Sequence, residues 1–201
     1  MKKIMLPMVV LVMTAFSQVD TSLSNAERTF AINELNKTYD RFTKTLDGLS
    51  KEQLNYKVAE DSWSIAECAE HLAISENSIF DVLAQTLNTE ADPSRRDEVK
   101  MADEQLIAMI EDRSNKVKTS KAFEPSGKYG SFEETVEEFK SKRKEHIEYI
   151  KSTQDDLRNR YQQFPFGTID AYQIVLFMSG HTERHVRQME ETMEDPGFPK
   201  S

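Results

Sequence analysis

The sequence predicts an all-α protein, a four-helix bundle with a long connection carrying a short extra helix between bundle helices two and three. Four long segments carry apolar residues at spacings of three and four, the pattern of a helix with one buried face. Only 6 glycines and 6 prolines occur among 201 residues, so long helices can run uninterrupted. No segment has a convincing strand pattern, and no strand is expected.

The first bundle helix is expected over about residues 24–49. Apolar residues recur there at steps of four, three, four and three, which places them in one stripe along the helix. They are Leu35, Tyr39, Phe42, Leu46 and Leu49. Residues 50–63 are expected to be a linker.

The second bundle helix is expected to start at Ser64 and to run to about Leu87. Ser64-Ile65-Ala66-Glu67 has the form of a capping box, in which the first and last side chains bond each other's backbone amide. Trp63 stands directly before this box, where an apolar residue packs against the first turn of a helix. We therefore interpret Trp63 as purely structural.

A long connection is expected over residues 88–130. A short helix is predicted at 98–112, and residues 113–130, with one proline and two glycines, are predicted to be a loop. A connection of roughly forty residues is long enough to shape the mouth of a site.

The third and fourth bundle helices complete the predicted fold. The third is expected to begin at a second capping box, Ser131–Glu134, and to end near residues 155–162. The fourth is expected from about Thr168 to about Met193. Its stretch Ile174–Met178 is apolar on every side, so we expect this helix to be the most deeply buried.

Residues 1–17 have the pattern of a secretory signal peptide. Two lysines precede the uncharged run Ile4–Phe16, and small residues stand where signal peptidase would read a cleavage point after Ser17. The run is shorter than the about 20 residues of a transmembrane helix. We expect export to the periplasm or the extracellular space, a mature domain of residues 18–201 and no stable membrane span after cleavage. A retained N-terminal membrane anchor and a buried first helix are the alternatives.

Composition excludes several classes of function. The formal net charge of −9 provides no basic surface for nucleic acid and disfavours adsorption to anionic lipid. Cys68 is the single cysteine, so neither an internal disulfide nor a Cys-x-x-Cys zinc site can form. Because Cys68 lies on the apolar stripe of the second helix, we expect a buried, unreactive thiol.

Three of the four histidines are predicted to bind a divalent metal. His181 and His185 lie four residues apart on the fourth helix, so they project from one face. His71 lies in the middle of the second helix, and facing helices of a bundle commonly supply ligands to one site. Three imidazoles leave coordination positions open, as in catalytic zinc sites. The alternative is that the three are ordinary polar residues lying apart in space.

The remaining polar candidates are predicted to play smaller roles. His146 stands among charged residues and is expected to be exposed. Glu67, Glu183 and Gln188 are candidate acceptors for the outer ring nitrogens of the histidines, although a solvated or capping role is the favoured interpretation for each. Glu67 and Glu70 are the candidates for a general base.

These motifs resemble the DinB-like family of bacterial four-helix-bundle metal proteins. Residues 63–72, which begin with Trp-Ser and end with Glu-His-Leu, are similar to the family's stretch on the second helix. Residues 180–188 are similar to its H-x-x-x-H-x-x-Q signature, and residues 123–131 are a weaker match. The resemblance covers about residues 24–192. It implies that the family's metal triad is His71, His181 and His185.

The expected function is that of an exported divalent-metal-binding protein, either a metal-dependent hydrolase or a thiol transferase. A metal with an open position can polarise a substrate oxygen, activate water or hold a thiolate. Three histidines suit Zn²⁺, Ni²⁺, Fe²⁺ or Mn²⁺, and affinity alone does not choose among them. Export disfavours the thiol transferase, because intracellular thiol cofactors are scarce outside the cell.

The expected partner is a small-molecule substrate, with no nucleic acid. Members of the family that this sequence resembles are often dimers, so a homodimer is possible. The alternative function is a non-enzymatic metal- or ligand-binding helical module of the cell envelope. A fourth side chain closing the metal site, such as His146, would favour this module.

Overall fold

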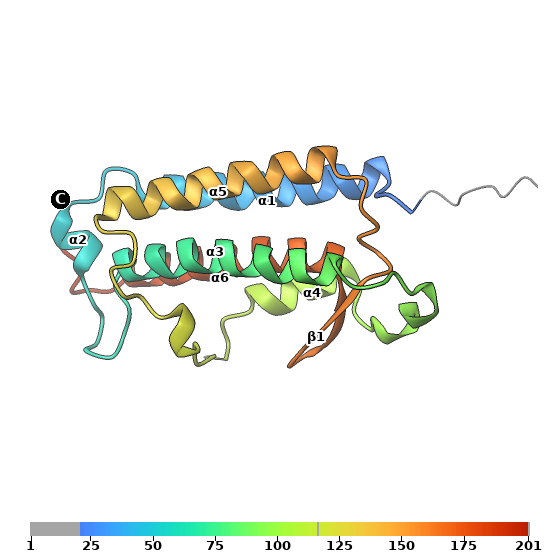
Figure 1. Ribbon diagram of the computed structural model, residues 1–201. Coiled ribbons are helices and arrows are strands. Elements are labelled where there is room, and N and C mark those ends of the chain that lie inside the picture. Colours follow the sequence, from blue (N-terminus) through green and yellow to red (C-terminus); the bar gives the residue numbers. More distant parts are fainter. Residues whose placement is uncertain (1–20, 116, 201) are drawn as a thin grey trace, which may run out of the picture.

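The computed structural model describes residues 21–115 and 117–200, and they form a four-helix bundle (Figure 1). The predicted signal peptide, residues 1–17, lies outside the described residues. The bundle helices are α1 (Asn25–Leu46), α3 (Ile65–Leu87), α5 (Phe132–Ser152) and α6 (Ala171–Met193). Figure 1 shows α1 beside α5 in one layer and α3 beside α6 in the other. No helix of the described part is long and apolar enough to cross a membrane.

Each bundle helix begins at a side chain that binds its free backbone amides. Ser24, Ser64 and Ser131 form capping boxes with the glutamates three residues later, and Asp170 accepts from the amide of Gln173 at the start of α6. The two capping boxes predicted at Ser64 and Ser131 are therefore confirmed. Each such cap stabilises its helix by about 1 kcal/mol.

The connection between α3 and α5 carries the predicted extra helix. It contains the 3₁₀ turn η1 (Pro93–Glu98), the helix α4 (Asp103–Glu111) and the 3₁₀ turn η2 (Lys121–Phe123). Helix α4 packs along α6. Figure 1 shows α4 and η2 on the outer side of the α3–α6 layer, away from α1 and α5.

The first helix is shorter than predicted, and the linker after it is partly helical. Gly48 has φ +72°, a left-handed conformation that ends α1 at Leu46. Ser50 then caps a separate short helix, α2 (Lys51–Asn55), inside the expected linker.

The prediction that the chain has no strand is wrong. β1 (Tyr161–Phe164) and β2 (Gly167–Asp170) form an antiparallel hairpin in which Tyr161 lies opposite Asp170. The fourth bundle helix consequently begins at Ala171, and Thr168 lies in β2. Strands of four residues are too short to give a clear two-residue period, which explains the error.

The core consists of two apolar clusters separated by a polar layer. Each bundle helix contributes one polar residue to this layer, and apolar residues of the two clusters lie about one turn away on either side. The four polar residues are Thr38 on α1, Glu76 on α3, Arg143 on α5 and Thr182 on α6, all at most 2% exposed.

Arg143 binds all three other helices of the bundle. Its guanidinium donates two hydrogen bonds of 2.8 Å to the Glu76 carboxylate. It also donates to the Leu35 carbonyl at 3.0 Å, to Thr38 Oγ1 at 2.8 Å and to Thr182 Oγ1 at 2.8 Å. All five N–H groups of the guanidinium are thus satisfied.

His146 is buried, and its predicted exposure is wrong. Its Nδ1 donates to Glu76 Oε1 at 2.9 Å, and its ring stacks on Phe80 with centroids 3.9 Å apart. Burial alone would raise the pKa of Glu76, but Arg143 and His146 outweigh it and hold that pKa below its ordinary value. The charges around His146 in the sequence occupy the other faces of α5.

We expect Arg143→Met to lower the free energy of unfolding by about 3–5 kcal/mol, because the Glu76 carboxylate would lose its main partner while staying buried. Urea unfolding measures this change. The double variant Arg143→Met/Glu76→Gln should lose less, since it removes both charges. Lys142→Met, which removes a neighbouring exposed cation, is the control. A loss below about 1 kcal/mol for Arg143→Met would contradict the importance of the pair.

Candidate metal centre

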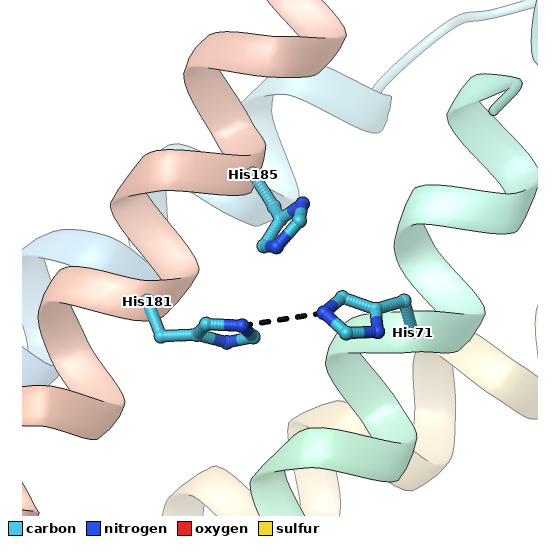
Figure 2. Close-up of side chains that lie close together, drawn as sticks. All are labelled: His71, His181 and His185. Carbon is cyan, nitrogen blue, oxygen red and sulfur yellow. Dashed lines mark hydrogen bonds between the residues drawn. The ribbon is translucent and has the colours of Figure 1, made fainter. Parts of the chain in front are cut away.

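The structure brings the three predicted histidines together between α3 and α6 (Figure 2). One ring nitrogen from each lies within 4.8 Å of the others. The Nε2 atoms of His71 and His181 are 3.2 Å apart. His146, the fourth histidine, is not part of this group and binds Glu76 instead.

The donor set fits a divalent metal ion. Two nitrogens bound to one zinc ion at about 2.0–2.1 Å lie about 3.3 Å from each other in tetrahedral coordination. The separation of 3.2 Å between the Nε2 atoms of His71 and His181 agrees with this value. The three residues could therefore hold an ion through imidazole nitrogens.

Hydrogen bonds orient two of the rings from behind. His71 Nδ1 donates to the carbonyl oxygen of Phe123, at the end of η2, at 2.7 Å. His185 Nδ1 donates to Gln188 Oε1 at 3.0 Å, and Arg113 donates to the same oxygen at 3.2 Å. With Nδ1 protonated, Nε2 of each ring carries the lone pair that can bind a metal. In the structure, the lone pair of His71 Nε2 accepts a hydrogen bond from His181 Nε2, drawn as a dashed line in Figure 2.

Burial keeps the three imidazoles neutral. It is the first cause that lowers the pKa of His71. Burial, followed by the nearby His71, lowers the pKa of His181 to about 3. Burial and the two neighbouring histidines lower the pKa of His185 well below its ordinary value. The neutral imidazole is the form that binds metal ions.

Of the three candidate acceptors for the histidine rings, only Gln188 accepts a hydrogen bond from one. Gln188 accepts from His185 as expected. Glu67 caps α3, as expected from the box Ser64–Glu67, and pairs with Lys57 at 2.8 Å. Glu183 likewise binds Arg41 and Arg187, at 2.6 and 2.9 Å.

The long connection is fastened to both helices that carry the histidines. Glu70, directly before His71, accepts from the backbone amides of Ser126 and Lys128 at 2.9 and 2.8 Å. Arg184, directly before His185, donates to three backbone carbonyls of the connection, those of Ile110, Asp112 and Asn115. The Glu70 carboxylate thus holds the loop, and we assign it no role as a base.

Trp63 and Cys68 complete the surroundings. The Trp63 ring lies 4.8 Å from that of His71 and 6.2 Å from that of His185, between centroids. A purely structural reading of Trp63 is therefore incomplete, because it flanks the candidate site. Cys68 is buried, and burial raises its pKa to about 12, which agrees with the predicted unreactive thiol.

Arg113 and the Phe123 carbonyl were not predicted from the sequence. Both lie in the irregular connection, and each reaches a residue of another segment more than fifty positions away. The position of Trp63 beside the site did have a signal in the sequence. Trp63 and His71 belong to the same short stretch, residues 63–72.

Comparison with known proteins agrees with this architecture. Residues 34–189 match the DinB superfamily. The chain belongs to this superfamily. Its relatives include the uncharacterized protein YuaE of Bacillus subtilis (strain 168), which is 29% identical over 150 residues, covering 74% of this chain and 88% of YuaE.

A solved structure shares the fold of this DinB-superfamily chain. YfiT from Bacillus subtilis superposes with a TM-score of 0.59 and 14% sequence identity, over 89% of this chain and 92% of YfiT. YfiT is described as a probable metal-dependent hydrolase with an unusual four-helix bundle topology. At this identity, the likeness establishes the four-helix-bundle fold.

The lowered histidine pKa values predict that the metal-free protein loses stability as the pH falls below about 6.5. The unfolded chain then binds protons at histidines that stay neutral in the folded chain. Each such histidine lowers the free energy of unfolding by about 1.4 kcal/mol per pH unit. For His181 this loss continues until the pH approaches about 3.

Urea unfolding with a chelator present, between pH 7.5 and pH 5, measures this dependence. His181→Asn should flatten it, because an amide does not titrate there. An equally steep dependence in His181→Asn would contradict the assignment of a neutral imidazole to His181 in the folded protein.

Proposed function

We propose that this protein binds one divalent metal ion through His71, His181 and His185 and acts as a metal-dependent hydrolase on a small-molecule substrate. The observation that carries the proposal is the convergence of three neutral imidazoles, two of them oriented by hydrogen bonds to their outer nitrogens. YfiT, which shares the fold, is described as a probable metal-dependent hydrolase, and this supports the same class of activity.

An ion held by three protein ligands would keep coordination positions open, and it would supply Lewis-acid chemistry that polarises a substrate oxygen and activates water. The chain's own residues would prepare the site. Gln188 and the Phe123 carbonyl hold His185 and His71 in place, and the Trp63 ring lies beside both histidines. His181 is only partly buried, so a substrate can approach from its side.

An open site favours an enzyme over a closed binding module. His146 was the side chain whose arrival at the metal would have favoured the non-enzymatic alternative. Its Nδ1 is bound to Glu76, within the polar layer of the core. We therefore place hydrolysis first, and thiol transfer by the same open position second.

We also propose that the protein is exported. The support is the pattern of residues 1–17, in which lysines precede an uncharged apolar run and a small-residue cleavage point. Outside the cell, low-molecular-weight thiols are scarce, which further favours hydrolysis over thiol transfer.

Metal content tests the central proposal. The chain from residue 18 onward should bind about one equivalent of Zn²⁺, Ni²⁺, Fe²⁺ or Mn²⁺, because three imidazoles supply the ligands. Plasma mass spectrometry measures the content after reconstitution and desalting. The double variant His181→Ala/His185→Ala should retain none. A wild-type protein that binds no metal after reconstitution with each ion would contradict the proposal.

Gln188→Ala should weaken zinc binding by about 10- to 100-fold, because His185 would lose the acceptor that orients its ring. Competition with a chromogenic chelator measures the dissociation constant. The matched control is Gln85→Ala, at an exposed position of α3. Equal affinities in the two variants would show that Gln188 has no part in holding the ligand.

A further inference from the structure

A row of aromatic rings continues from His181 along α6 to the hairpin. Phe177 lies one helical turn before His181, and the two rings stack with centroids 5.9 Å apart and planes at 17°. Phe166, in the hairpin turn, stacks on Phe177 at 6.0 Å and 18°. Phe164 lies 5.3 Å from Phe166 and 5.4 Å from Phe177. We call Phe164, Phe166 and Phe177 the aromatic wall.

The aromatic wall lies on the accessible side of α6. Within residues 171–180, every residue is buried except Phe177, and His181 is partly exposed in the same way. Phe164 and Phe166 are also partly exposed. Phe177 and the two hairpin rings pack against the buried apolar cluster on one side, and each stays partly accessible on the other, as His181 does.

The segment that carries the aromatic wall contains almost no charged residues. Asp170 is the one acidic or basic residue between Phe164 and His181. It is fully buried and paired with Arg96 and Arg158. In a chain with 30% charged residues, this stretch therefore brings no exposed charge of its own next to His181.

The hairpin is placed to border the site. Figure 1 shows the hairpin and the segment around η2 projecting from the same outer side of the α3–α6 layer. The end of η2 reaches the site, since the Phe123 carbonyl accepts from His71. The histidines therefore have Trp63 against His71 and His185, and the aromatic wall against His181.

We infer that the aromatic wall binds a planar, apolar group of the substrate, next to the oxygen that reaches the metal. This inference rests on the proposed function and names its substrate class, which is esters, amides or related carbonyl compounds with an aromatic group beside the carbonyl. Aromatic rings stack favourably in offset geometry, and an uncharged surface selects against charged substituents. The competing account is that the three rings only fasten the hairpin to α6.

Two hydroxamic acids test the inference by binding rather than by turnover. Acetohydroxamic acid and benzohydroxamic acid carry the same metal-binding group, and they differ in a methyl against a phenyl substituent. The full chain, loaded with Zn²⁺, is titrated with each acid by calorimetry. We expect benzohydroxamic acid to bind about tenfold more tightly, as stacking and burial of one ring provide.

Two variants of the aromatic wall and one control separate the accounts. Phe166→Ala and Phe177→Leu should each reduce the preference for benzohydroxamic acid to less than about twofold. The second variant keeps an apolar side chain, so it guards against loss of folding in the first. Phe198→Ala, which removes a partly buried ring packed on Tyr56, should keep the full preference.

The outcomes are distinct. Equal affinity for the two acids in the zinc-loaded wild type would overturn the aromatic wall as a binding surface, while the metal centre would stand. A preference that survives in both wall variants would show that the rings only fasten the hairpin. Failure of the wild type to retain zinc would overturn the proposed function, and this inference with it.

Discussion

The buried pair of Arg143 and Glu76 is the interaction on which the arrangement of the bundle depends. An unpaired charge in this polar layer would cost several kcal/mol, so sliding or rotating one helix against the others is unfavourable. Glu76 follows His71 by five residues on α3, and Thr182, another partner of Arg143, directly follows His181 on α6. By setting the positions of α3 and α6 along each other, the pair also sets how the histidines of the two helices meet.

Features with a local, periodic signal could be predicted from the sequence. The four long helices, the capping boxes at Ser64 and Ser131 and the spacing of His181 and His185 all depend on residues three or four apart. The partnership of Arg143 with Glu76 could not be predicted, because 67 positions separate the two and no alignment of facing helices is visible in one sequence. The hairpin was missed because its strands have four residues each, and His146 was misplaced because its partner lies on α3.

The convergence of His71 with the α6 pair was expected from the motifs, whereas its surroundings were not. The acceptor of His71 is a backbone carbonyl, which no side-chain pattern can reveal. The sequence also indicated that Ile174–Met178 would be buried on every side. Four of these residues are buried and Phe177 is not, and this exception marks the stripe of α6 that faces the candidate site. The one residue of this stretch that is not buried, Phe177, therefore locates the accessible face of α6.

The attachment of the long connection has a consequence for the thermodynamics of ligand binding. Glu70 and Arg184 hold the connection through its backbone groups, and neither contact uses one of the three histidines. The conformational entropy of these loop residues is therefore lost when the chain folds, rather than when the histidines acquire a ligand. Pre-organisation of this kind would leave little loop-ordering entropy to subtract from the affinity for a metal ion.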